Sequence, residues 1–269
     1  MDGIKQELTA LESLFGEMAA EAKGDDAELY DCPLCRDTGY LIENGYARPC
    51  TCRNDAQLLV RKTSAGLTTR LRRMRFDNFE LRVYPADLKL QNASYRSLAK
   101  RAFEDARRFT AACIRGEETE SILFEGEVGC GKTHLAAAIT NELLEAGKDV
   151  LFLVVPEFLD SLRASYRREN EGMDETEIIK RAYQAPVLIL DDLGAHNYTE
   201  WVSNKLFTII NHRYNRSLPC VITTNLSIME LEQNIGERAA SRMLESCHIH
   251  RMAIDRDMRY QHNLAGLRL

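Results

Sequence analysis

Residues 126–133 read Gly-Glu-Val-Gly-Cys-Gly-Lys-Thr and match the spacing G-x-x-x-x-G-K-[ST]. Glycines let the backbone curl so that several N–H groups surround one anion, and the helix that follows presents its positive N-terminus to it. Lys132 would reach the β- and γ-phosphates of a nucleoside triphosphate, and the Thr133 hydroxyl would bind Mg²⁺. The residues predicted to surround the nucleotide are Gly126, Glu127, Val128, Gly129, Cys130, Gly131, Lys132, Thr133 and His134.

Two adjacent carboxylates, Asp191 and Asp192, end the apolar run 187–190. An aspartate at the end of a buried strand beside a phosphate loop holds the Mg²⁺ shell. We therefore predict that Asp191 lies on the metal side and that Asp192 polarises the attacking water as a general base. The alternative is that both acids cap the helix that follows.

Asn225 and two arginines are further candidates for chemistry on the phosphates. Asn225 ends another apolar strand and could hydrogen-bond the γ-phosphate or the lytic water, although a strand-end turn would explain it equally. Arg238 and Arg242 lie four residues apart, which places them on one face of a helix. A guanidinium suits the transition-state charge on a γ-phosphate when a neighbouring subunit supplies it. A salt-bridged surface helix is the alternative.

Four of the eight cysteines lie close together in the pattern C-x2-C-x14-C-x-C, with the hairpin signal Asn44-Gly45 between the two pairs. Four thiolates brought together in this way fit a tetrahedral Zn²⁺ with no position left for water, and hence a structural site. The alternative is four reduced, buried cysteines. The predicted zinc ligands are Cys32, Cys35, Cys50 and Cys52.

Alternating strands and helices must position the nucleotide residues. Strands are predicted at 121–126, 150–155, 187–191, 219–224 and 248–254, and helices at 92–114, 132–147, 157–184 (in two pieces), 199–216 and 228–245. Near-continuous apolar strands that alternate with helices predict an α/β fold, with a five-stranded parallel sheet between helices.

Composition limits the classes of function. A chain of 269 residues, 45% of them hydrophobic, can bury one large core beside a small domain. A net charge of −6 gives no overall nucleic-acid signature, so any such contact must use local basic patches. No apolar run approaches the ~20 residues that cross a membrane, and no signal-peptide core is present, so we expect a cytoplasmic protein without membrane contact.

Two segments have more than one possible role. Apolar residues at helical spacing over 3–22 predict an amphipathic helix that either folds onto its own domain or binds a partner. The basic stretch 61–75 could contact phosphates or an acidic partner, or form a solvated linker helix. We predict three parts: an N-terminal helix and cysteine module over 1–60, a basic linker over 61–90, and an ATPase domain over 91–269.

These motifs, in this order, resemble the AAA+ ATPases of the replication-initiator group, and most of all the bacterial and phage replicative helicase loaders of the DnaC/DnaI type. The likeness rests on 126–136, on Asp191-Asp192-Leu193-Gly194, on Thr223-Thr224-Asn225, which is similar to sensor 1, and on 237–242, which is similar to box VII. In addition, Phe76-Asp77-Asn78-Phe79 resembles a short motif that such loaders carry near the adenine.

The resemblance implies an ATPase that uses ATP and Mg²⁺, with Arg242 at the arginine-finger position. Its catalytic residues would be Lys132, Asp191, Asp192, Asn225 and Arg242. Because 27 residues follow Arg242, it also implies little or no C-terminal helical lid. The cysteine module is similar to the zinc-binding, helicase-interaction domain of DnaI-type loaders.

In that family, ATP-bound protomers would associate through Arg242 in trans, hold a hexameric replicative DNA helicase open and pass single-stranded DNA into it. Hydrolysis of ATP would then release the loader. A transposition-helper ATPase of the IstB type, and a nucleotide-dependent binding protein with negligible turnover, are the alternatives. Candidates for DNA contact are Arg163, Tyr166, Arg167, Arg168, Lys180, Arg181, Tyr198, Thr199 and Trp201, the last of which could instead be a packing residue.

Overall fold

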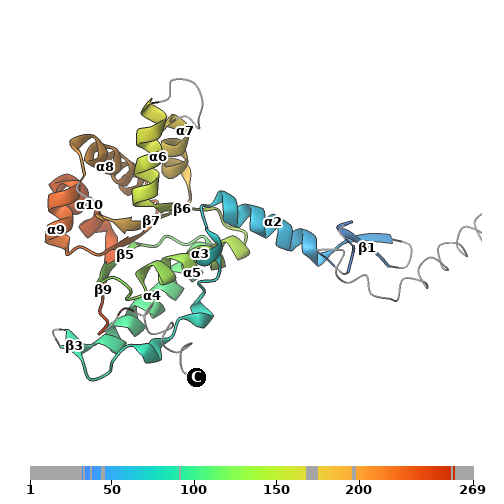
Figure 1. The fold of residues 1–269 in the computed structure, drawn as a ribbon, viewed down its shortest axis with the longest axis horizontal. Helices are drawn as coiled ribbons and strands as arrows, with labels where there is room; N and C mark the ends of the chain where they lie inside the picture. Colours follow the sequence, from blue (N-terminus) through green and yellow to red (C-terminus); the bar gives the residue numbers. More distant parts are fainter. Residues whose placement is uncertain are drawn as a thin grey trace, which may run out of the picture. The chain divides into compact units, whose positions relative to one another are not determined.

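The computed structural model, shown in Figure 1, describes residues 32, 34–36, 38–43, 46–90, 92–167, 175–195, 198–255 and 257. The chain divides into two compact units, Met1–Leu59 and Val60–Leu269. The amphipathic helix predicted over residues 3–22 lies outside the described residues. Among the helices that the structure describes, none is long and apolar enough to cross a membrane.

The first unit contains an antiparallel hairpin beside the cysteine pairs. Strand β1 (Tyr40–Glu43) pairs with β2 (Tyr46–Pro49), and the register places Tyr40 opposite Pro49. Helix α2 (Thr51–Ser64) begins two residues after β2. The hairpin predicted between the two cysteine pairs is therefore present, and it brings Cys50 and Cys52 back towards Cys32 and Cys35.

The second unit is built on a five-stranded parallel sheet, as predicted. Its strands are β5 (Ser121–Gly126), β6 (Val150–Val154), β7 (Val187–Leu193), β8 (Cys220–Thr224) and β9 (Cys247–Met252). The strand order is β6-β7-β8-β5-β9, and every pair is parallel. Parallel strands end at the same edge, so the segments that follow β5, β7 and β8 meet there.

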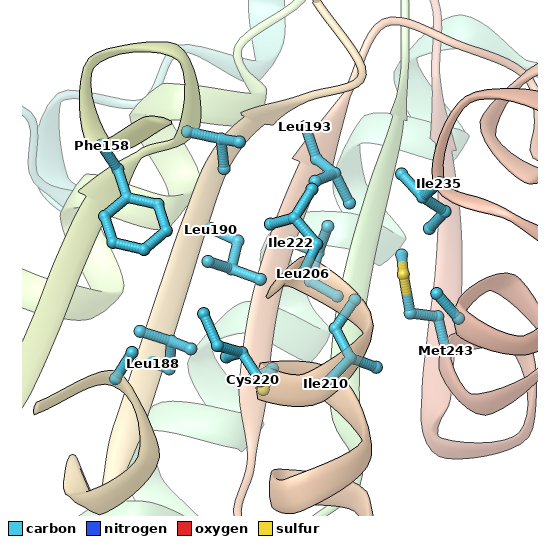
Figure 2. Packing of buried hydrophobic residues seen from close by; sticks show 14 of the residues in the cluster. Phe158, Leu188, Leu190, Leu193, Leu206, Ile210, Cys220, Ile222, Ile235 and Met243 are labelled. Carbon is cyan, nitrogen blue, oxygen red and sulfur yellow. The ribbon is translucent and has the colours of Figure 1, made fainter. Parts of the chain in front are cut away.

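Helices cover both faces of this sheet (Figure 1). One face carries α4 (Tyr95–Arg115) and α5 (Lys132–Glu145), and the other carries α6 (Val155–Arg167), α7 (Glu175–Gln184), α8 (Glu200–Tyr214), α9 (Ile228–Ile235) and α10 (Glu237–Ser246). Figure 2 shows the second face, where Leu190 and Ile222 of the sheet meet Leu206 of α8 and Met243 of α10. Burial of such apolar side chains is the main force that holds the layers together.

Short elements precede the sheet and lead the chain from α2 to α4. They are α3 (Thr69–Arg72), the 3₁₀ turns η2 (Phe76–Asn78) and η3 (Leu81–Val83), and the small hairpin β3 (Lys89–Leu90) and β4 (Ala93–Ser94). Helix α4 is well bounded, because the Ser94 hydroxyl accepts a hydrogen bond from the Ser97 N–H and Gly116 closes its end at φ 74°.

Two segments differ from the sequence-based expectation. The single helix expected over 228–245 is two helices, because Gly236 adopts φ 88° and ends α9 before α10 begins. The segment 61–90, expected as a linker, belongs to the second unit. There Arg61 donates to the carbonyls of Leu144 and Lys148 at 3.0 and 2.9 Å, which satisfies backbone acceptors at the end of α5 and just after it.

Candidate nucleotide site and metal centre

The phosphate-loop sequence lies between β5 and α5, where a nucleotide-binding loop requires it. Gly131 precedes the first residue of α5 and adopts φ 94°. Gly126 adopts φ 154°, and a Cβ at this position would lie only 1.9 Å from the Met252 carbonyl oxygen of β9. Glycine is therefore required at residue 126 by the close approach of a neighbouring strand as well as by the backbone conformation.

Lys132 and the loop backbone are held together by hydrogen bonds. The buried Lys132 ammonium donates to the carbonyls of Gly126 and Glu127, both at 2.7 Å. The Tyr84 hydroxyl donates to the Cys130 carbonyl at 2.7 Å. Burial raises the pKa of the Tyr84 phenol, so it remains a proton donor. Tyr84 was not predicted as a site residue, because no local pattern links it to a loop 46 residues later.

His134 contacts the segment that precedes the ATPase core. Its Nε2 lies 2.8 Å from the Arg75 carbonyl oxygen, and its ring meets the Phe79 ring edge-on at 5.3 Å. The segment that resembles the adenine-side motif, 76–79, therefore lies against the first turn of α5. A role of His134 in nucleotide binding stays a prediction.

Asp191 is placed to hold a magnesium ion with Thr133. The Thr133 hydroxyl donates to Asp191 Oδ1 at 2.9 Å, and the Thr223 hydroxyl donates to the same oxygen at 2.7 Å. Burial raises the pKa of Asp191 despite these two hydrogen bonds, so a cation beside it would stabilise its charged form. Carboxylate and hydroxyl oxygens are ligands that Mg²⁺ accepts, and the pair fits the predicted metal side of the site.

The backbone at Asp192 is irregular. The register between β7 and β8 shifts between Leu190 and Leu193, and Asp192 adopts φ 61°. Its N–H donates to the Thr223 hydroxyl at 2.9 Å, and its Oδ1 accepts from Asn225 Nδ2 at 2.9 Å. Because Asp192 is less buried than Asp191 and is joined to Asn225, the two residues are well placed to orient a water molecule.

Arg242 lies apart from this cluster. It is on α10, its guanidinium lies over the Tyr214 ring of α8 at 4.7 Å, and its Nε donates to Asn211 Oδ1 at 3.3 Å. The structure thus brings Lys132, Thr133, Asp191, Asp192 and Asn225 together at the ends of β5, β7 and β8, while Arg242 contacts α8.

Several residues expected to contact DNA have structural roles. Arg181 donates to the Ser64 carbonyl at 2.7 Å, the Tyr198 hydroxyl accepts the Gly194 N–H at 2.7 Å, and Thr199 caps α8. Trp201 packs against the core, and Lys205 lies over its ring at 5.6 Å. Other candidates, Arg163, Tyr166, Arg167 and Arg168, have side chains outside the described residues.

The four clustered cysteines converge as a metal site requires. All four Sγ atoms lie within 4.8 Å of one another, with Cys32 Sγ 3.8 Å from Cys50 Sγ and Cys35 Sγ 3.3 Å from Cys52 Sγ. Burial opposes ionisation of Cys35, but hydrogen bonds from Cys52 and the Gly39 N–H outweigh it and lower its pKa to about 7. The donor set fits a structural zinc ion.

Comparison with known proteins identifies the family of the chain. Residues 58–265 match the family model described as IstB-like ATP binding protein. The chain belongs to this family. It is 32% identical to the replicative helicase loader DnaC of Escherichia coli K12 over 123 residues. The aligned segment covers 46% of this chain and 49% of DnaC. It thus spans about half the length of this curated relative.

Two other relatives come from mobile elements. The chain is 32% identical over 170 residues to a putative ATP-binding protein in an insertion sequence of Mycobacterium tuberculosis, covering 62% of this chain and 61% of that protein. It is 27% identical over 265 residues to the phage-like element PBSX protein XkdC of Bacillus subtilis, covering 93% and 92%. The relatives of this chain therefore include a replicative helicase loader and proteins of mobile elements.

Solved structures confirm the predicted AAA+ fold of the second unit. A crystal structure of the DnaC helicase loader superimposes with a TM-score of 0.55 at 25% identity, covering 69% of this chain and 99% of that one. AMPPCP-bound DnaA from Aquifex aeolicus superimposes with a TM-score of 0.54 at 18% identity, covering 72% and 54%. The resemblance to the initiator group of AAA+ proteins is confirmed, and the chain is an ATP-binding protein of that fold.

Proposed function

We propose that this protein is an ATP-dependent loader that binds a hexameric replicative DNA helicase and helps to place it on single-stranded DNA. ATP hydrolysis serves as the switch for release, in replication initiation or restart. Lys132 and Thr133 bind ATP and Mg²⁺, Asp191 holds the metal, and Asp192 with Asn225 orients the attacking water. Protomers associate through Arg242 in trans. The proposal implies a cytoplasmic protein.

Hydrolysis is supported by the convergence of two unlike carboxylates. Asp191 is buried and held by two threonine hydroxyls, which suits a metal ligand. Asp192 is less buried and is joined to Asn225 at 2.9 Å, which suits a general base. The side chain of an aspartate base is shorter than that of a glutamate base, so we expect slow hydrolysis of ATP. Slow hydrolysis fits a switch better than a motor.

The ATPase activity is tested by Asp192→Asn. This change keeps the shape of the side chain and the contact with Asn225, and it removes the base. The steady-state rate should fall at least about 100-fold, with affinity for ATP retained. A wild-type rate no higher than that of Asp192→Asn would refute hydrolysis and leave a nucleotide-dependent binding protein.

The observation that carries the loader assignment is the cysteine cluster. It lies in a unit of its own, outside the residues 58–265 that match the ATP-binding family. The hairpin of this unit exposes large apolar side chains, with Ile42 81% and Tyr46 80% exposed. Exposed apolar residues on a small cysteine module favour a protein partner over DNA, because contact with a protein surface would remove these side chains from water.

The partner is tested by co-purification of the full chain with the hexameric helicase of its host. The double variant Ile42→Asp/Tyr46→Asp should lose binding, because two charges would have to be buried at the interface. Met229→Asp, at a residue 75% exposed on α9, is the matched control. Failure of the wild-type protein to bind, with zinc present and ATP added, would remove the loader assignment.

A transposition-helper ATPase is the second candidate function. It is favoured by the match to the IstB-like family and by the relative from an insertion sequence. This function requires a transposase and duplex DNA as partners, and neither needs the cysteine module. ATP-dependent binding to a transposase, combined with no binding to the helicase, would favour it.

A further inference from the structure

Two arginines of α10 lie against aromatic rings of α8. The guanidinium carbon of Arg238 is 4.7 Å from the centre of the Phe207 ring, and that of Arg242 is 4.7 Å from the centre of the Tyr214 ring. Both distances fall in the range of a cation–π interaction. The two distances are equal, and Arg242 in addition contacts polar side chains of α8 and of its own helix.

Arg242 is held by more than its ring contact. Its Nε donates to Asn211 Oδ1 at 3.3 Å, and its Nη1 lies 4.0 Å from Glu245 Oε2. A hydrogen bond to Glu245 raises the pKa of the Tyr214 phenol, so the ring that supports Arg242 remains neutral. Tyr214 and Asn211 are three residues apart on α8, which places both on the face that contacts α10.

We propose that Tyr214 and Asn211 are positioning residues that hold Arg242 in the conformation in which it reaches the nucleotide of a neighbouring copy of this chain. This inference rests on the proposed role of Arg242 in trans. The Tyr214 ring lies beneath the guanidinium carbon, and Asn211 accepts a hydrogen bond from the Nε–H. The Nη groups carry the other four N–H donors. Nη1 lies 4.0 Å from Glu245 and the guanidinium also hydrogen-bonds the Tyr214 hydroxyl, so the donors not used there, and the one that Glu245 gives up, can bind phosphate oxygens.

The Arg242 side chain is accessible to a neighbouring subunit, since it is 39% exposed. Its ion pair with Glu245 is long and lies at the surface, so a phosphate can replace Glu245 at little cost. An arginine that is already ordered loses less conformational freedom when it binds the phosphate. Tyr214 and Asn211 therefore favour the catalytic contact without touching the nucleotide.

The core does not depend on the Tyr214 ring. Tyr214 borders a groove of about 610 Å³, which Leu218, Met243 and Ser246 also line. Leu206 and Ile210 of α8 and Met243 of α10 lie in the core between these helices and the sheet (Figure 2). Tyr214→Leu should thus leave the fold intact. Phe207→Leu is the matched control, because it removes the ring beneath Arg238 on the same two helices.

The test is an ATPase assay on mixed full-length protomers. Alone, Tyr214→Leu should lower kcat about 2- to 5-fold, and the double variant with Asn211→Ala on the order of 10-fold, with an unchanged KM for ATP. Asp192→Asn protomers do not hydrolyse ATP but carry an intact Arg242. When Asp192→Asn protomers are mixed with the double variant, the ATPase rate should exceed the sum of the rates of the two proteins measured separately. The same should hold when they are mixed with Arg242→Ala. Phe207→Leu should retain the wild-type rate.

Each contrary result has a distinct meaning. The first case is that Asp192→Asn rescues Arg242→Ala, but the Tyr214→Leu/Asn211→Ala double variant either is active alone or is not rescued. The positioning role is then refuted, and the trans role of Arg242 stands. If Phe207→Leu lowers the rate and Tyr214→Leu does not, Arg238 is the trans group and the inference is refuted. If Arg242→Ala keeps full activity or is not rescued, the trans role itself fails.

Discussion

Thr223 connects the two carboxylates that are expected to do different chemistry. Its hydroxyl donates to Asp191 Oδ1 at 2.7 Å and accepts the Asp192 N–H at 2.9 Å. One hydroxyl on β8 therefore orients the proposed metal ligand and also stabilises the left-handed backbone of Asp192, at φ 61°. Groups that orient metal ligands in this way contribute strongly to metal affinity and activity.

Thr223→Ala should accordingly lower kcat for ATP on the order of 10-fold or more, because Asp191 and Asp192 lose a shared hydrogen-bonding partner. Affinity for ATP in the absence of Mg²⁺ should change little, since the phosphate loop is intact. Steady-state kinetics and a fluorescent-ATP titration measure the two effects. Thr223→Ser, which keeps the hydroxyl, is the control, and equal activity of the Ala and Ser variants would contradict the role of Thr223.

Asp191→Asn should abolish hydrolysis and yet stabilise the nucleotide-free protein. Burial raises the pKa of Asp191 in the folded state, so its charge opposes folding at any pH above the pKa of the unfolded carboxyl. Removal of the charge should add about 0.5–2 kcal/mol to the free energy of unfolding at pH 7. The gain should shrink as the pH falls towards about 4, where the unfolded carboxyl is also protonated.

Urea unfolding followed through the fluorescence of Trp201, the one tryptophan of the chain, measures this difference in Mg²⁺-free buffer. Glu232→Gln, at an exposed residue of α9, is the control for a general charge effect. A destabilised Asp191→Asn protein at pH 7 would contradict the conclusion that burial dominates at this residue.

Residues with a local motif could be predicted from the sequence, and residues that act through tertiary contacts could not. Lys132, Thr133 and Asp191 lie in short patterns whose chemistry is readable from their spacing. The joint action of Thr223 on Asp191 and Asp192 depends on β8 lying beside β7. Likewise, Tyr84 reaches Cys130 only because the chain returns across the phosphate loop. Such contacts depend on the strand order and on long-range packing.

At the scale of elements, the free edge of β6 is partly covered by the turn after α2. The Phe152 N–H of β6 donates to the Ala65 carbonyl at 2.7 Å. Gly66, at φ 92°, lies so close that a Cβ would be 2.3 Å from the Phe152 carbonyl oxygen. This contact protects an edge strand whose backbone groups would otherwise be open to pairing with another chain.

Gly66→Ala should therefore destabilise the protein by more than its backbone conformation alone requires. Gly116→Ala is a matched control, because Gly116 has φ 74° and a Cβ there would meet nothing within 4 Å. The control should cost about 1 kcal/mol through the left-handed conformation, and Gly66→Ala about 1–3 kcal/mol more through the clash. Equal losses in thermal or urea unfolding would show that the turn does not pack tightly on β6.

The elements themselves were largely predictable, because the strands are apolar runs of ordinary length between helical patterns. The split at Gly236 was signalled by the glycine itself, although the apolar spacing continues across it. By contrast, the partners of the basic stretch 61–75 were not readable. Arg61 binds backbone carbonyls at the end of α5 and just after it, more than 80 residues away, so its charge does not indicate its partner.

At the scale of the whole molecule, the chain consists of two units with different sources of stability. The second unit buries an extensive apolar core on each side of its sheet, whereas the described core of the first unit consists of Cys32, Cys35 and Cys50 with Leu41 and Cys52 against them. Because so small a core gives little stabilisation by burial, we expect this module to depend on a metal for folding. The family match begins at residue 58, near the boundary between the units.

Removal of zinc should therefore unfold the first unit and leave nucleotide binding by the second intact. The protein purified with zinc should contain one ion per chain, and Cys35→Ser should release it, because one of four thiolate ligands is lost. Cys113→Ser, at a cysteine on α4, should keep the ion. In a strong chelator, protease should cleave within residues 32–59 while the affinity for ATP stays within about 2-fold, since the second unit has its own core. Loss of ATP binding on chelation, or equal zinc content in the two cysteine variants, would contradict the division of the chain into a metal-dependent module and an independent nucleotide-binding unit.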